Sequence, residues 1–172
     1  MGGLVKYNVE SNMIRTSDAK GHDDPFDLGR FTTAQESVYD DVCIELRSGQ
    51  KRTHWMWFIF PQIDGLAQST TSKFYAIKSL DEARHYLDHP VLGKRLLECT
   101  DTVLAVEGRP ISEIFAYPDD LKLQSSMTLF GYIAGPESIF IRILDKYYRG
   151  ERDIRTLKIL NMYKINAHGE QS

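Results

Sequence analysis

The strongest helical pattern in the chain lies in residues 118–134, and it combines two apolar stripes with a polar line. Pro118 suits the first helical position, where its missing N–H is not needed. At about 100° per residue, a line of three polar residues, Asp119, Lys122 and Ser126, lies between the stripes. The apolar stripes consist of Leu123, Met127, Phe130 and Ala134 on one side and of Leu129 and Ile133 on the other.

Two interpretations of this polar line are open. In the structural one, Asp119 and Lys122 form an i, i+3 ion pair, and Ser126 bonds to the carbonyl group four residues earlier. In the functional one, the line forms the wall of a pocket for an anionic or hydroxyl-rich ligand. Burying an unpaired polar group costs free energy, so each of these side chains needs a partner of one kind or the other.

Six or seven helices are predicted, with no clear strand, so the fold class is all-α in a single compact domain with short loops. Capping boxes begin the helices at Thr33 and Ser79, and Gly49 ends the first of them. The predicted helices other than 118–135 are 33–48, 55–60, 80–88, 91–106, 138–150 and 154–160.

The largest apolar run is residues 55–60, which holds both tryptophans. All six residues are apolar, so the run is predicted to be buried on every side, as a short helix or a central strand. We favour a helix, because no other segment offers a strand partner for its backbone groups. Pro61 ends the run.

The length of 172 residues predicts one domain. We expect a flexible N-terminal arm at 1–26, a helical domain at 27–160 and a C-terminal tail at 161–172. The two cysteines, Cys43 and Cys99, lie in helical patterns and predict buried, reduced thiols. No signal peptide or membrane-spanning run is found, so a soluble cytoplasmic protein is the expectation.

The net charge and the absence of known sequence motifs exclude several classes of function. A net charge of -3 argues against a protein whose whole surface binds nucleic acid. No motif for a nucleotide cofactor, a phosphate-binding loop or a zinc protease occurs, so no cofactor is predicted. His85 and His89 have metal-ligand spacing, but Pro90 interrupts the helix after them, so no metal site is predicted. Oligomeric state is left open.

Ligand-binding candidates gather around the aromatic run and the loop that follows it. His54, Trp55 and Trp57 offer an imidazole and two indole rings, and Lys122 and Ser126 offer an ammonium and a hydroxyl group. The loop adds Gln62, Ser69 and Ser72. Turn and capping chemistry is the usual explanation of its row of hydroxyl groups, and a lone histidine beside aromatic residues, such as His54, is more often a packed residue. Unplaced acid–base candidates are His54, Asp64, Glu113, Asp119 and Asp120.

Three blocks, at 54–77, 79–98 and 114–130, resemble a family named Domain of Unknown Function eighteen-ten. The resemblance covers residues 31–160 and implies a mostly helical single domain. Ala67 and Ala116 stand where the family usually has glycine, which restricts the backbone there. Some members carry the label calpastatin, which implies a protease inhibitor. A weaker, fold-level similarity is to the helical NADAR proteins, which process ADP-ribose attached to guanine bases.

The resulting prediction is a helical domain with a pocket for a nucleotide-like or ADP-ribose-like ligand. The ligand would stack on a tryptophan and pair its phosphates with Lys122. If the pocket is catalytic, the expected reaction is hydrolysis of an N-glycosidic bond, with Asp119 or Asp120 steadying positive charge or activating water. The alternative is a non-catalytic protein-interaction module that uses an exposed apolar patch.

Overall fold

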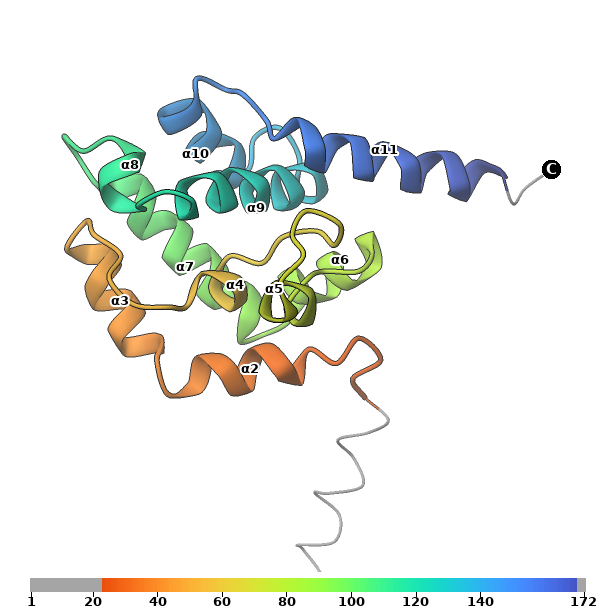
Figure 1. Ribbon diagram of the computed structural model, residues 1–172, viewed down its shortest axis with the longest axis horizontal. Helices are drawn as coiled ribbons and strands as arrows, with labels where there is room; N and C mark the ends of the chain where they lie inside the picture. Colours follow the sequence, from red (N-terminus) through yellow and green to blue (C-terminus); the bar gives the residue numbers. More distant parts are fainter. Residues whose placement is uncertain (1–22, 170–172) are drawn as a thin grey trace, which may run out of the picture.

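The computed structural model describes residues 23–169, and these form ten helices with no strand beyond one isolated bridge (Figure 1). The all-α class is therefore confirmed for the described residues. The helices, labelled as in Figure 1, are α2 (Gly29–Glu36), α3 (Tyr39–Arg47), α4 (Met56–Ile59), α5 (Thr70–Phe74), α6 (Leu80–Asp88), α7 (Leu92–Ala105), α8 (Ile111–Ile114), α9 (Asp119–Ala134), α10 (Ile139–Tyr148) and α11 (Ile154–Gly169).

The predicted count of six or seven helices is too low for two physical reasons. Helices α5 and α8 have only five and four residues, too few to show a helical period in the sequence. The predicted helix at 33–48 is two helices, because the backbone leaves helical geometry at Val38 between α2 and α3.

The predicted start of helix α2 was also wrong. Thr33 is inside α2, which begins at Gly29. The cap comes from Asp24, whose two carboxylate oxygens accept hydrogen bonds from the backbone N–H groups of Leu28 at 2.7 Å and Gly29 at 2.8 Å. Asp24, five residues before Gly29, therefore caps the helix in place of the capping box predicted at Thr33.

Two long helices organise the domain. Helix α7 packs against α3, α4, α6 and α10, and helix α9 packs against α6, α8, α10 and α11. Figure 1 shows α2 and α3 on one side of this pair and α10 and α11 on the other. The approach of α9 and α10 is close at Gly131, where a Cβ atom would lie 2.6 Å from Ile141 Cδ1.

The apolar run at 55–60 is a buried helix, as predicted, and it forms the centre of the aromatic core. Trp55 and Phe60 are buried, and both pack against Phe115 with ring centroids 6.2 and 6.0 Å away. Trp57 differs from its neighbours, because it is only half-buried. A helix of only four residues can leave one ring partly exposed while it buries the other three side chains.

The C-terminal helix is longer than the sequence predicts. Helix α11 continues to Gly169, past residue 160, because its first half packs on α9 and the helix then runs beyond the body of the domain (Figure 1). The N-terminal segment predicted as an arm lies almost wholly outside the described residues. Within residues 23–169, no helix combines the length and apolarity needed to cross a bilayer.

Candidate functional site

The candidate site is built on a loop at residues 62–77 whose two ends are joined. Asp64 N–H donates to the carbonyl oxygen of Ile77 at 2.8 Å, and Ile77 N–H donates to that of Gln62 at 2.8 Å. Ile63 and Ile77 are buried beside these bonds. A surface loop closed at its base in this way is an Ω-loop, a type of segment that frequently carries function.

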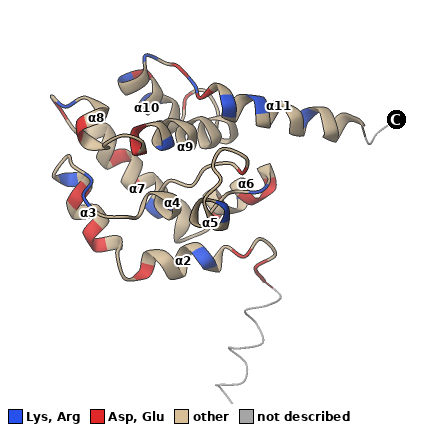
Figure 2. Ribbon diagram, in the orientation of Figure 1, with Lys and Arg blue, Asp and Glu red and all other residues tan. Residues whose placement is uncertain are grey.

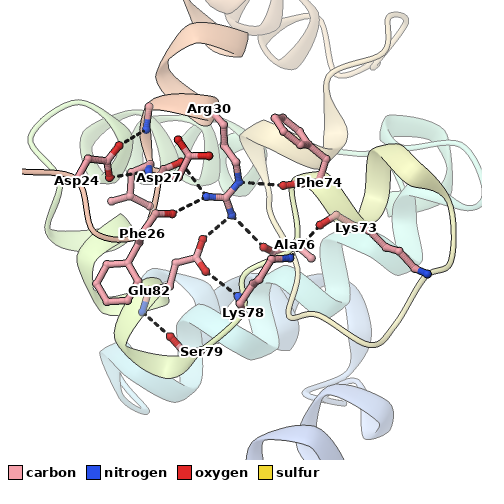
Figure 3. A network of polar contacts seen from close by, with 12 residues as sticks. Asp24, Phe26, Asp27, Arg30, Lys73, Phe74, Ala76, Lys78, Ser79 and Glu82 are labelled. Carbon is pink, nitrogen blue, oxygen red and sulfur yellow. Dashed lines mark hydrogen bonds and ion pairs between the residues drawn. The ribbon is translucent and has the colours of Figure 1, made fainter. Parts of the chain in front are cut away.

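Arg30 on α2 holds the second half of this loop (Figure 3). Its guanidinium group donates to the carbonyl oxygens of Phe74 at 2.9 Å and Ala76 at 3.0 Å, and it forms an ion pair with Glu82. Two further donations go to the carbonyl oxygens of Phe26 and Asp27. All five N–H donors of the buried arginine are therefore used, which fixes the loop against α2.

Glu82 extends the same network into the start of α6. Its second oxygen accepts a hydrogen bond from the Lys78 N–H at 2.7 Å, and its own N–H donates to Ser79 Oγ at 3.0 Å. This confirms the predicted capping signature at Ser79. The capping glutamate also pairs with Arg30, so one residue both begins the helix and anchors the loop (Figure 3).

Helix α11 holds the outer part of the loop. Arg155 donates to the Leu66 carbonyl oxygen at 2.7 Å, and the Tyr163 hydroxyl donates to that of Lys78 at 3.1 Å. Gly65 has a φ of 100°, and a Cβ atom there would lie 3.3 Å from Ile159 Cδ1. The second half of the loop is therefore fixed by α2 and α6, and its outer turn by α11.

Between this loop, α4 and α9 lies a small pocket, here called the Trp57–Lys122 pocket. It encloses about 370 Å³ including its open mouth, of which about 30 Å³ can hold the centre of a water molecule. That inner space accepts about two waters or one small polar group. Its wall consists of Trp57, Gln62, Ile63, Asp64, Gly65, Leu66, Ala67, Ser72, Tyr75, Ala76 and Lys122.

Lys122 connects the two sides of the pocket. Its ammonium nitrogen lies 4.6 Å from the centroid of the Trp57 ring and 3.1 Å from Asp119 Oδ1. The first contact is a cation–π interaction between α9 and α4, and the second is the predicted i, i+3 ion pair. Both interpretations of the polar line thus describe Lys122, since it is paired and also faces a pocket.

Several polar groups of the wall have no hydrogen-bond partner within residues 23–169. These are the indole N–H of Trp57, the side-chain amide of Gln62, the carboxylate of Asp64 and the hydroxyl of Tyr75, all on half-buried residues. Polar side chains elsewhere in the core are mostly bonded, as Arg30 and Glu82 are. Half-buried polar groups that line one pocket without an internal partner are available to bond to water or to a ligand.

Of the predicted site residues, the structure brings Trp57, Gln62, Ser72 and Lys122 together at the pocket. Trp55 lies elsewhere, buried in the core with its indole N–H bonded to Glu45. Sequence reasoning could not separate the two tryptophans, because both belong to one uniformly apolar run. Only the geometry of α4 decides which ring reaches the pocket.

The other predicted residues are not part of the pocket wall. Ser69 caps α5 by accepting a hydrogen bond from the Ser72 N–H at 3.1 Å. His54 is exposed before α4. Ser126 is fully buried, and its hydroxyl has no hydrogen-bond partner among the described residues. The backbone carbonyl of Asp120 accepts a hydrogen bond from the Tyr148 hydroxyl at 2.6 Å, which ties this residue to α10.

Asp119 is the most strongly bound carboxylate near the pocket. Burial opposes its ionisation, but hydrogen bonds from Lys51 and Lys122 outweigh that effect and lower its pKa. Lys51 Nζ lies 2.8 Å from Asp119 Oδ2, and Lys122 Nζ lies 3.1 Å from Oδ1. The two oxygens therefore have a lysine each, and Asp119 is ionised at neutral pH.

Asp64 and Tyr75 line the pocket but were not among the predicted site residues. Asp64 appeared only as an unplaced acid–base candidate, and nothing in the sequence singled out Tyr75. The loop shows no hydrophobic period from which the direction of one side chain can be inferred. In the part of the chain that the structure describes, no group of three or more His, Cys, Asp or Glu side chains is arranged to hold a metal ion.

Comparison with known proteins agrees with the fold and the resemblance. A family model described as "Protein of unknown function (DUF1810)" matches residues 25–160. The crystal structure of a conserved hypothetical protein, Rv1873 from Mycobacterium tuberculosis, is similar, with a TM-score of 0.78 and 54% sequence identity. That match covers 79% of this chain and 97% of the other. No curated protein matches the chain. Neither description refers to calpastatin or to NADAR proteins.

Proposed function

The chain belongs to the DUF1810 family of proteins of unknown function, and we propose that its Trp57–Lys122 pocket binds a nucleotide-like ligand. The single observation that carries the proposal is the placement of an ammonium group on an indole ring at the pocket mouth, 4.6 Å from the ring centroid. An aromatic face beside a positive charge suits a ligand with a flat ring and a phosphate.

The size of the pocket restricts how the ligand binds. The inner space of about 30 Å³ admits one small group, whereas a whole nucleotide is several times larger. One polar group of the ligand enters the pocket, and the remainder lies across the open mouth.

The charges on the wall orient the ligand. The Asp64 carboxylate accepts hydrogen bonds and repels an anion, so an N–H group of the ligand faces it. The Lys122 ammonium group donates hydrogen bonds and attracts negative charge, so the phosphate lies on the α9 side of the pocket. A ligand with both features therefore binds in one direction, with its N–H groups toward the loop and its phosphate toward α9.

Hydrolysis of an N-glycosidic bond is the first reaction to test on any ligand that binds. Asp119 and Asp120 are the carboxylates predicted for this step. Asp119 is held by two lysines, and neither aspartate is part of the pocket wall. Asp64 is the carboxylate on the wall, and it is the one available to steady positive charge or activate water.

The test is a thermal-shift screen with ADP-ribose, NAD and mononucleotides, followed by calorimetry with wild type and Lys122→Met. A ligand that binds only the folded state raises the melting temperature by mass action. We expect a shift with wild type and a loss of about tenfold or more in affinity in Lys122→Met. Lys94→Met, which removes an exposed charge on α7, is the matched control and should bind like wild type.

A second candidate function is a non-catalytic interaction module, favoured by the outer face of α11. Ile154, Met162 and Ile165 are 66%, 56% and 71% exposed, which is unusual for large apolar side chains on one helix. The helix also carries lysine and arginine but no acidic residue (Figure 2). No shift with any nucleotide at millimolar concentration, together with a stable partner lost in Ile165→Asp, would favour this module.

A further inference from the structure

The Asp119 carboxylate carries one negative charge but pairs with two ammonium groups, each with one positive charge. Lys51 approaches one carboxylate oxygen at 2.8 Å and Lys122 the other at 3.1 Å. Each lysine also lies over a tryptophan ring, Lys51 over Trp55 at 4.9 Å and Lys122 over Trp57 at 4.6 Å. Two positive charges against one negative charge leave a net charge of about +1 on the cluster of Lys51, Asp119 and Lys122.

The two lysines are not equivalent. The side chain of Lys51 is 8% exposed, and its ammonium group also donates to the Thr53 carbonyl oxygen. Its backbone N–H donates to the Ile114 carbonyl oxygen at 2.8 Å, so both ends of the residue are held. Lys51 is therefore a firmly held partner of Asp119, and it is not part of the pocket wall.

Lys122 is held less firmly. Its side chain is 23% exposed, Asp119 is its one hydrogen-bond acceptor within the described residues, and it forms part of the pocket wall. An ammonium group in this position can rotate from Asp119 to a ligand anion without leaving the ring of Trp57. The move is inexpensive only if Asp119 keeps another counter-charge, because an unpaired, partly buried carboxylate is costly.

We propose that Lys122 is an exchangeable cation and that Lys51 is the positioning residue that makes the exchange possible. This rests on the proposed function and specifies its ligand class, a nucleotide with a compact phosphate group. When the phosphate enters, Lys122 moves from Asp119 to a phosphate oxygen, and Lys51 keeps Asp119 neutralised. No proton or covalent bond is transferred. Without Lys51, the carboxylate retains Lys122 and repels the incoming anion.

The test compares ADP-ribose, which carries phosphates, with adenosine, which shares the base and sugar but is uncharged. In Lys51→Met we expect about tenfold weaker binding of ADP-ribose and a change of less than about twofold for adenosine. Lys51→Arg restores the ADP-ribose affinity, because the guanidinium group keeps the positive charge beside Asp119.

The decisive variant is Lys51→Met combined with Asp119→Asn. An amide does not compete for Lys122, so the double variant regains ADP-ribose affinity that Lys51→Met has lost. If Lys51 serves only to maintain the fold, the second change cannot restore binding, and that result overturns the exchange. Equal weakening of ADP-ribose and adenosine in Lys51→Met overturns it as well. If Lys51→Met does not fold, the double variant and Asp119→Asn alone decide, since both must bind ADP-ribose at least as tightly as wild type.

These outcomes are distinct from failure of the proposed function. If neither ADP-ribose nor any other nucleotide binds wild type, the nucleotide site itself is wrong. If ADP-ribose binds and requires Lys122, but the double variant remains as weak as Lys51→Met, the site stands and only the exchange is wrong.

Discussion

The indole N–H of Trp55 donates a hydrogen bond to Glu45 Oε2 at 2.8 Å within the core. Glu45 also accepts hydrogen bonds from the backbone N–H groups of Arg52 and Thr53 and from the Thr53 hydroxyl, at 2.8, 3.1 and 2.6 Å. A single buried carboxylate thus holds the segment that leads into α4, and α4 in turn presents Trp57 to the pocket.

Replacing Glu45 with glutamine should destabilise the protein in a pH-dependent way. Burial opposes ionisation of Glu45, but its hydrogen bonds outweigh burial and lower its pKa from 4.5. A lowered pKa in the folded state stabilises the protein above pH 4.5, and this contribution is lost as the pH falls through the folded-state pKa. Glu45→Gln should therefore lose about 1–3 kcal/mol near pH 7.

Urea unfolding of Glu45→Gln at a series of pH values checks this. The difference from wild type should shrink below pH 4.5. Asp41→Asn, an exposed acidic residue on the same helix, is the control and should show little change. A difference that stays constant from neutral to acid pH would contradict the role given to the ionised Glu45.

Lys122→Met should have only a small effect on stability. Asp119 keeps Lys51, and Lys122 is partly exposed, so the lost pair is worth less than about 1 kcal/mol. Thermal or chemical unfolding without ligand measures this loss. Lys164 Nζ lies 5.2 Å from the centroid of the Tyr132 ring, so Lys164→Met is the matched cation–π control. A large loss in Lys122→Met alone would show that Lys122 is a structural residue and is not free to exchange.

Arg30→Gln should loosen the second half of the loop before it unfolds the domain. The substitution removes the donors to the carbonyl oxygens of Phe74 and Ala76 and leaves Glu82 without its buried partner. Breaking a buried pair from one side costs about 3–5 kcal/mol. Hydrogen exchange should accelerate most in residues 74–82.

The control for this experiment is Arg84→Gln, which removes an exposed pair with Asp81 on the same helix. It should leave the exchange rates of the loop near those of wild type. Uniform acceleration across the domain in Arg30→Gln, with no preference for the loop, would mean that the network supports the global fold and does not specifically anchor the loop.

Gly93→Ala should be strongly destabilising although alanine favours helices. A Cβ atom at Gly93 would lie 1.9 Å from the Leu87 carbonyl oxygen, a backbone atom that cannot rotate away. Forcing the two segments apart should cost about 1–3 kcal/mol or more. Gly169→Ala, where a Cβ atom meets nothing within 4 Å, is the control, and equal stability of both variants would contradict the predicted clash.

Much of the pocket was predictable because it depends on local patterns. The period of residues 118–134 placed Lys122 between two apolar stripes, and helix α9 begins one residue after the predicted start and ends at Ala134. The loop after Pro61 was identified by its glycine and hydroxyl residues, and Gln62 and Ser72 do line the pocket. The prediction that Asp119 or Asp120 is catalytic remains untested.

Other features depend on contacts between distant segments. Ser126 follows the same period as Lys122, yet it is buried without a hydrogen-bond partner among the described residues, because the pocket ends before this turn of α9. Lys51 lies 68 positions before Asp119, and no pattern in the sequence connects the two. Long-range ion pairs of this kind leave no periodic signal.

The sequence by itself determined the helical class, the central buried run and the polar line on α9, because these follow from period, capping and composition within short segments. Only the tertiary structure decided which tryptophan faces the pocket, which lysine is the more deeply buried partner of Asp119, and where Arg30 anchors the loop. Those outcomes depend on how helices pack across long separations in the chain, and packing geometry is a property of the assembled domain.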